Sequence, residues 1–147
     1  MAERLLAGRT GLVHQGKGKI SFGRAPEVGI DARLWRLLTI AADECGLVVH
    51  VSSVDTGEHA AHSRHYSGRA VDIDQVGQVG KGLRPATLDN KAAAQLAHWF
   101  RSHRFLAYEG GPWRALLWGP PRSQGNASTV PHNGHLHASI ADEEPVA

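Results

Sequence analysis

The segment 69–74 alternates between apolar and polar side chains, which is the pattern of a half-buried β-strand. Val71 and Ile73 are apolar, so we expect their side of the strand to face the core. The opposite side carries Ala70, Asp72 and Asp74. Gln75 would fall on the apolar side, so we expect the strand to end there.

A second segment, residues 135–140, alternates in the same way near the end of the chain. Its core-facing positions are predicted to be Leu136, Ala138 and Ile140. The opposite side carries His135, His137 and Ser139. Two further strands are predicted, at residues 47–52, which are short, apolar and β-branched, and at residues 113–118.

Apolar residues at helical spacing predict two helices. The first begins after Asp31, whose carboxylate suits an N-cap, and runs to about Cys45, with Gly46 as its stop. Its apolar stripe is formed by Leu34, Leu37, Leu38, Ala41 and Ala42. The second begins within residues 88–90 and runs to about His103. Its stripe is formed by Ala93, Leu96, Ala97 and Phe100.

The remaining segments have the composition of loops. Residues 1–30 are rich in glycine and are predicted to be irregular, apart from a short strand at residues 19–22. Further loops are expected at residues 53–67, 77–85 and 119–134, and residues 142–147, which begin with three acidic side chains, are expected to form a flexible tail. The pattern predicts a single α+β domain over residues 1–147, with a mostly antiparallel sheet packed on helices.

Composition narrows the classes of function. The 147 residues carry a net charge of +2, and their basic residues are scattered, which argues against nucleic acid as a partner. The single cysteine, Cys45, cannot form an intrachain disulfide, and its apolar surroundings predict a buried, inert thiol. Residues 1–20 carry no apolar signal region, and no apolar run is long enough to span a bilayer. We therefore expect a protein that is made in the cytoplasm without a signal peptide. We also expect it to be a monomer.

Histidine stands out, because the chain has ten and they cluster. His59, His62 and His65 form one group, and His132, His135 and His137 form another. Clustered imidazoles suggest metal binding or proton transfer more than packing. If the two alternating strands are neighbours, His65, Asp72 and His137 can converge on one point. Two imidazoles and one carboxylate suit Zn²⁺, and three protein ligands leave a fourth position open, as in catalytic zinc sites.

The segment from Ser63 to Asp72 matches the pattern S-x-H-x-x-G-x-A-x-D at every fixed position. Here the sequence resembles the zinc D,D-peptidase and hedgehog signalling-domain superfamily. The second signature of that superfamily, H-x-H, is found as His135-Leu-His137. The resemblance covers about residues 33–141. It implies a small antiparallel sheet packed on helices, with zinc bound by His65, Asp72 and His137.

The sequence departs from this pattern at the general base. Most D,D-peptidase relatives carry an Asp or Glu three residues before the last ligand, where this chain has Gly134, and hedgehog-like proteins carry a Glu where it has Pro131. The H-x-x-H-x-H spacing that begins at His132 is similar to that of penicillin-insensitive murein endopeptidases. That similarity assigns His132 and His135 to proton transfer and oxyanion stabilisation, and leaves open which does which. Glu109 is a reserve candidate for the base.

The superfamily's dipeptidases and carboxypeptidases usually carry an arginine that holds the terminal carboxylate of the substrate. Residues 51–55 lack it, which favours cleavage within a longer peptide. Three other arginines are candidates for that charge: Arg64, Arg69 and Arg114. The four tryptophans, Trp35, Trp99, Trp113 and Trp118, are expected to be core or loop anchors, with Trp113 and Trp118 as candidates for a substrate wall. His59 and His62 are expected at the rim of the cleft, with a separate three-histidine site that includes His65 as the alternative.

These features predict a zinc metallopeptidase that hydrolyses peptide bonds of bacterial peptidoglycan as an endopeptidase. Its site of action would be the cell wall, for instance as a phage lysis or tail protein or an injected effector. Two alternatives remain open. One is a hedgehog-like zinc-binding module that has lost turnover, and the other is a D,D- or L,D-dipeptidase or carboxypeptidase acting on short peptides.

Overall fold

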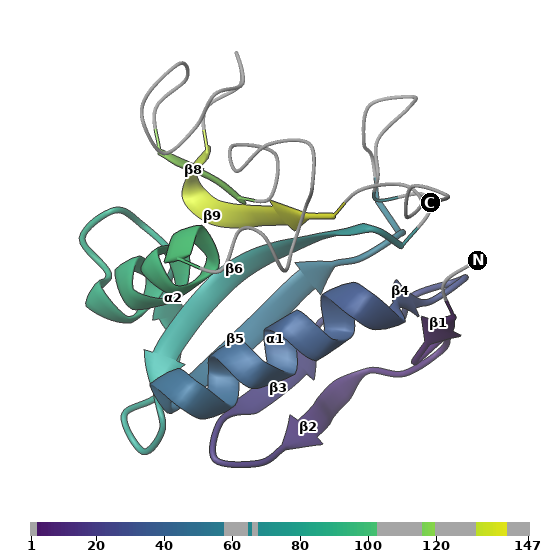
Figure 1. The fold of residues 1–147 in the computed structure, drawn as a ribbon, viewed down its shortest axis with the longest axis horizontal. Coiled ribbons are helices and arrows are strands. Elements are labelled where there is room, and N and C mark those ends of the chain that lie inside the picture. The colour runs from purple at the N-terminus through teal and green to yellow at the C-terminus, as the bar shows by residue number, and fades with distance from the viewer. Residues whose placement is uncertain (1–2, 58–64, 66–67, 103–115, 120–131, 141–147) are drawn as a thin grey trace.

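The computed structural model describes residues 3–57, 65, 68–102, 116–119 and 132–140. Two helices lie together on one face of a seven-stranded sheet, and a two-stranded sheet lies near the N-terminus (Figure 1). This arrangement confirms the predicted α+β class. None of the helices in these ranges is both long and apolar enough to cross a membrane.

The large sheet has the strand order β2-β3-β5-β6-β9-β8, and β7 pairs with β6 beside this path. Its strands are β2 (Gly11–Gln15), β3 (Lys19–Phe22), β5 (Leu47–Ser53), β6 (Ala70–Gln78), β7 (Arg84–Pro85), β8 (Leu116–Gly119) and β9 (His132–Ser139). The small sheet pairs β1 (Arg4–Leu5) with β4 (Ile30–Asp31). The long strands β5, β6 and β9 therefore lie side by side in the middle of the molecule (Figure 1).

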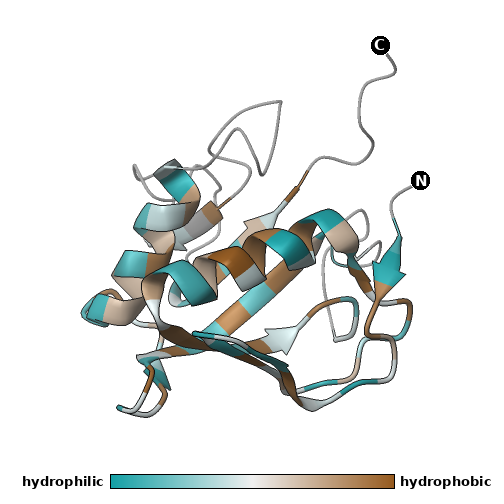
Figure 2. Cartoon of the chain, turned by 60° about the horizontal axis from the view of Figure 1, so that its bottom comes forward, coloured by the Kyte–Doolittle hydropathy of each residue, from teal (hydrophilic) through white to brown (hydrophobic). Residues whose placement is uncertain are grey.

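One pair in the large sheet, β3 and β5, is parallel, and the other pairs are antiparallel. Parallel neighbours need a long crossover, which the helix α1 (Ala32–Cys45) supplies. α1 packs on β3 and β5, while α2 (Lys91–Ser102) packs on β6 and β8 and contacts α1. Both helices thus cover the same face of the sheet, and no helix of the described residues covers the other (Figure 2). We call that second side the open face.

The predicted starts of both helices and the predicted end of α1 are confirmed. The carboxylate of Asp31 accepts a hydrogen bond from the backbone N–H of Arg33, as an N-cap should. Gly46 ends α1 in the left-handed conformation at φ +64°, which glycine adopts without strain. Asn90 caps α2 by accepting from the backbone N–H of Ala93, 3.1 Å away.

The core lies between the helices and the sheet. The predicted stripes of both helices are buried in it, as are Val71, Ile73 and Leu136 from the alternating strands. Trp99 and Trp118 also belong to the core, and the indole N–H of Trp118 donates to the carbonyl of Ala86. The predicted role of Trp118 in a substrate wall is therefore wrong, because its ring is enclosed.

The strand predicted at residues 19–22 is confirmed as β3, but the rest of residues 1–30 is less irregular than predicted, because β2 forms an antiparallel hairpin with β3 and β1 and β4 form a second small sheet. The predicted 77–85 loop is also shorter, since β6 runs to Gln78 and β7 follows. β9 begins at His132, three residues before the predicted strand start. Cys45 is half-buried rather than buried, and burial raises the pKa of its thiol.

A β-bulge explains why β6 continues beyond Gln75. His50 of β5 pairs with Gln75, but the next residue, Val51, pairs with Ile73, so Asp74 is an extra residue on β6. The bulge shifts the phase of alternation by one position. Val76 then returns to the core, although a regular strand would have turned it outward.

Candidate metal centre

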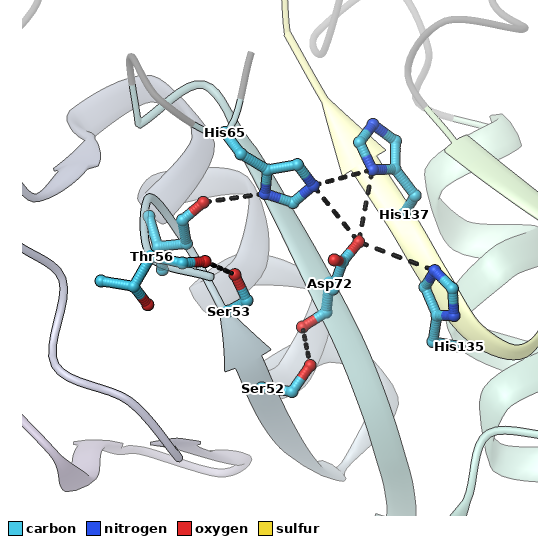
Figure 3. A network of polar contacts seen from close by, with 8 residues as sticks. Ser52, Ser53, Thr56, His65, Asp72, His135 and His137 are labelled. Atoms are coloured by element: carbon cyan, nitrogen blue, oxygen red, sulfur yellow. Dashed lines mark hydrogen bonds and ion pairs between the residues drawn. The ribbon is translucent and has the colours of Figure 1, made fainter. Parts of the chain in front are cut away.

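Antiparallel pairing of β6 with β9 places Asp72 directly opposite His137. Their neighbours along each strand, Ile73 and Leu136, are buried in the core, so Asp72 and His137 must both face the open side. This pairing also explains how the predicted site joins segments 65 residues apart. Figure 3 shows Asp72 on one strand and His137 and His135 on the next, with their side chains turned toward one another.

His65 completes the cluster from the turn that precedes β6. Its Nδ1 lies 2.8 Å from the carbonyl oxygen of Val54, and because a carbonyl only accepts, Nδ1 carries the proton. The Nε2 of the neutral ring is then a lone pair directed at Asp72 and His137 (Figure 3). A backbone carbonyl that fixes the tautomer and orientation of an imidazole is typical support for a metal ligand. The side chain of His65 is buried.

The three predicted ligand atoms form a nearly equilateral triangle. The Nε2 of His65 lies 3.2 Å from Nδ1 of His137 and 3.3 Å from Oδ1 of Asp72, and these last two atoms lie 3.3 Å apart. One carboxylate oxygen and two imidazole nitrogens therefore point at one centre. The cluster could hold a metal ion, because each of these three atoms can offer an electron pair to a cation at their centre.

Electrostatics keep Asp72 ionised. Burial raises the pKa of its carboxyl, but the imidazoles of His137 and His65 beside Oδ1 outweigh burial and hold that pKa well below its usual range. Burial lowers the pKa of His137, only partly opposed by Asp72, and so favours the neutral ring. An ionised carboxylate beside the neutral imidazole of His137 is the protonation state that metal binding requires of these two residues.

Gly68, the glycine of the S-x-H-x-x-G-x-A-x-D pattern, shapes the turn between His65 and β6. It has φ +72°, and its backbone N–H donates to the carbonyl of His65, 2.9 Å away. Its own carbonyl accepts from the backbone N–H of Asp31, 2.8 Å away. A Cβ at this position would collide with the carbonyl oxygen of Gly29. Both the conformation and the close approach therefore require glycine.

A buried carboxylate anchors the segment against which Gly68 packs. Asp55 accepts hydrogen bonds from the backbone N–H groups of Glu27, Val28 and Gly29, at 2.7, 2.7 and 3.0 Å. Because Asp55 directly follows Val54, the same strand end holds both this segment and the ring of His65. The sequence does not predict this support, because hydrogen bonds between a side chain and the backbone of a distant segment leave no pattern in the neighbouring residues.

The two predicted proton-transfer histidines lie beside the triangle. The Nε2 of His135 is 3.8 Å from Oδ1 of Asp72, and its side chain is 37% exposed. His132 is buried, and its ring centre lies 4.9 Å from that of His135 and 5.8 Å from that of His137. His135 therefore lies at the solvent side of the cluster, with His132 beside it.

Several predicted residues lie outside the described part of the chain: His59, His62, Arg64, Glu109, Trp113 and Arg114. Arg69 is described, and its Nε lies 3.9 Å from the buried carboxylate of Asp31. Asp31 also pairs with Arg4 and Arg33, so Arg69 belongs to a cluster around the start of α1 rather than to the metal centre. Comparison with protein-family models, curated proteins and solved structures gives no match to this chain.

Proposed function

We propose that the protein is a zinc-dependent peptidase acting on the peptides of bacterial peptidoglycan. The observation that carries the proposal is the triangle of His65 Nε2, Asp72 Oδ1 and His137 Nδ1, with sides of 3.2–3.3 Å. It is supported by the sequence resemblance to zinc D,D-peptidases, whose ligand pattern these three residues match.

The donor set and its spacing both favour zinc. Tetrahedral ligands about 2.0–2.1 Å from a zinc ion are about 3.3–3.4 Å apart, close to the sides of this triangle. Magnesium and calcium prefer all-oxygen sites, whereas two of these three atoms are imidazole nitrogens. A two-histidine, one-carboxylate set with an open fourth position is the arrangement of hydrolytic zinc enzymes.

Each polar side chain then has a role. When bound, zinc would polarise the scissile carbonyl and lower the pKa of a coordinated water to about 7. His135, half-exposed and 3.8 Å from the Asp72 carboxylate, lies where it can take a proton from the attacking water and pass it to the leaving amine. His132 lies behind His135 and is the candidate for stabilising charge on the tetrahedral oxygen.

The substrate class follows from the resemblance and from one departure. Residues 51–55 lack the arginine that exopeptidase relatives use to hold a terminal carboxylate. We therefore infer cleavage within a longer stem or cross-linking peptide, with the bacterial cell wall as the site of action. The free D,D- or L,D-dipeptide is the alternative substrate, which a panel of short peptides distinguishes.

A zinc-binding module without turnover is the second candidate. It is favoured by Gly134, an exposed residue at the position where the D,D-peptidases carry their catalytic carboxylate. Two histidines beside the triangle argue for turnover, because a purely structural site does not need them.

The deciding experiment is the loss of turbidity of purified sacculi, with products identified by mass spectrometry. Zinc-loaded protein should release peptide fragments, and chelator-treated protein should not. His137→Ala should lose both zinc and activity, whereas His135→Ala should keep zinc and lose at least about 100-fold in rate. His98→Ala, an exposed histidine on α2, is the matched control and should behave as wild type. Zinc-loaded wild type that cleaves neither sacculi nor stem peptides would instead identify a binding module.

A further inference from the structure

The three ligands of the metal centre are supported in different ways. Asp72 and His137 lie opposite each other on β6 and β9, so the pairing of these two strands fixes their positions. His65 lies outside the strands, in the turn that precedes β6. Zinc requires each ligand atom within about 0.2 Å of its ideal distance. The position of His65 must therefore come from contacts other than the sheet.

The ring of His65 is held by the residue that follows the end of β5 by one position. The carbonyl oxygen of Val54 lies 2.8 Å from Nδ1 and accepts its proton. The next residue is Asp55, whose side chain is buried at 6% exposure. The proposed zinc chemistry does not use this carboxylate.

Both oxygens of the Asp55 carboxylate are occupied by backbone donors from residues 27–29. Oδ1 accepts from the N–H of Glu27 at 2.7 Å, and Oδ2 accepts from the N–H groups of Val28 and Gly29 at 2.7 and 3.0 Å. A carboxylate suits this position because it only accepts, and it can do so on both oxygens. Asp55 therefore fixes residues 27–29 against the chain that leaves β5.

This segment in turn holds the backbone of His65. The carbonyl oxygen of Gly29 lies where a Cβ of residue 68 would be, so the two backbones are in close contact at Gly68. The N–H of Asp31 donates to the carbonyl of Gly68, 2.8 Å away, and the N–H of Gly68 donates to the carbonyl of His65, 2.9 Å away. A displacement of residues 27–29 would therefore displace the backbone of His65.

We propose that Asp55 is a positioning residue of the metal centre, whose carboxylate holds His65 at the place and orientation that zinc requires. The ring is set by Val54 and the backbone by residues 27–31, and Asp55 joins these two supports. The inference takes the identity of the metal from the proposed function, but it does not depend on peptide hydrolysis. Asparagine should not replace Asp55, because its NH₂ group would face N–H donors.

Asn90 offers a matched control for a role in folding alone. It is as buried as Asp55, at 4% exposure, and its amide group also binds three backbone groups: the carbonyls of Val76, Arg84 and Pro85. These contacts hold β7 and the start of α2, which are not in contact with any of the three ligands. Loss of either side chain should destabilise the protein, but only loss of Asp55 should affect the metal.

The test measures zinc affinity by competition with a chromophoric chelator, and ligand geometry by the visible absorption of cobalt-loaded protein. Asp55→Asn should raise the Kd for zinc about tenfold or more, as is typical when support of a metal ligand is removed, and should alter the cobalt bands. Asn90→Ala should leave both as in wild type. Urea denaturation identifies conditions under which both variants are folded, with trimethylamine N-oxide added where needed.

Asp55→Ala removes all three hydrogen bonds and is the more severe variant. If it does not fold, Asp55→Asn still decides, because it keeps the size of the side chain and one acceptor oxygen. Wild-type zinc affinity and cobalt bands in folded Asp55→Asn would overturn the positioning role. Equal changes in Asp55→Asn and Asn90→Ala would also overturn it.

The proposed function fails separately, in the sacculus assay. A loss of zinc affinity in Asp55→Asn but not in Asn90→Ala, together with no hydrolysis by the wild type, would support the positioning role in a binding module. A wild type that takes up no zinc would overturn both.

Discussion

The Nε2 of His65 and the Nδ1 of His137 lie 3.2 Å apart, although 72 residues separate them in the chain. The hydrogen bond from His65 to Val54 leaves a lone pair on Nε2, and an ionised carboxylate, that of Asp72, lies 3.3 Å from both nitrogens. A metal cation between these three atoms could accept an electron pair from each of them. The fold thus brings together, where the sequence pattern predicts a metal site, three residues that could hold a metal ion.

Zinc should stabilise the folded protein, because it binds a site that exists only in the native state. At a free zinc concentration of 100 times the Kd, the expected gain in the free energy of unfolding is about 2.7 kcal/mol. Thermal unfolding with and without zinc measures it. His137→Ala should abolish the gain, whereas His98→Ala should retain it. An equal rise in Tm for wild type and His137→Ala would place the zinc elsewhere.

Gly68→Ala should destabilise the protein by about 3 kcal/mol or more, because left-handed strain adds to the collision with the Gly29 carbonyl. Urea denaturation measures this loss, and zinc titration should show weaker binding because His65 is displaced. Gly80→Ala is the matched control, since Gly80 has φ +87° and open space around its Cβ position. It should cost only about 1–2 kcal/mol. Equal costs at the two sites would mean that the contact with Gly29 is unimportant.

Asp31 should make stability depend on pH. Burial raises the pKa of its carboxyl, but hydrogen bonds and charge from Arg33, together with Arg4, outweigh it and lower that pKa below the ordinary value. A lowered folded-state pKa means that Asp31 stabilises the native state fully above about pH 4, and that this contribution is lost as pH falls through the folded pKa.

The check is the free energy of unfolding at pH 7 and pH 3 for wild type and Asp31→Asn. The variant should be less stable at pH 7 by about 1–3 kcal/mol, and the difference should shrink at pH 3. Glu27→Gln, which removes an exposed carboxyl, is the control. A difference that stays constant with pH would show that the charge of Asp31 does not contribute.

Asn90→Ala should lower stability by about 2–4 kcal/mol without changing the affinity for zinc. Its buried amide group donates to the carbonyls of Val76 and Pro85, at 3.0 and 2.9 Å, and also lies 3.3 Å from that of Arg84. Urea denaturation should show the loss, while Gln95→Ala on the exposed side of α2 should not. A fall in zinc affinity would mean that the metal centre depends on the position of α2.

The sequence predicts α1, α2, β5 and most of β6 and β9 because their apolar periodicity and caps are local signals. The neighbouring residues are enough to predict Asp31 and Gly46 as helix ends. They are also enough to predict Val71 and Leu136 as core positions. The same alternation predicts that Asp72 and His137 share a face. Their direct pairing was a hypothesis, because strand neighbours are chosen by the whole sheet.

The missed features depend on contacts between distant segments. β2 has an incomplete alternation, so the sequence predicts its partner β3 but not β2 or the hairpin that joins them. The bulge at Asp74 shifts the phase of β6, which a regular pattern cannot anticipate. The sequence does not predict the hydrogen-bonded His50–Asp74 pair either, because the pair joins two strands across that bulge.

The most direct test of the metal centre is the anomalous difference map of zinc-loaded crystals, recorded above and below the zinc absorption edge. We expect one peak, about 2.0–2.1 Å from Nε2 of His65, Oδ1 of Asp72 and Nδ1 of His137. A strong peak bound by other residues, or crystals of active protein with no zinc between these three atoms, would contradict it.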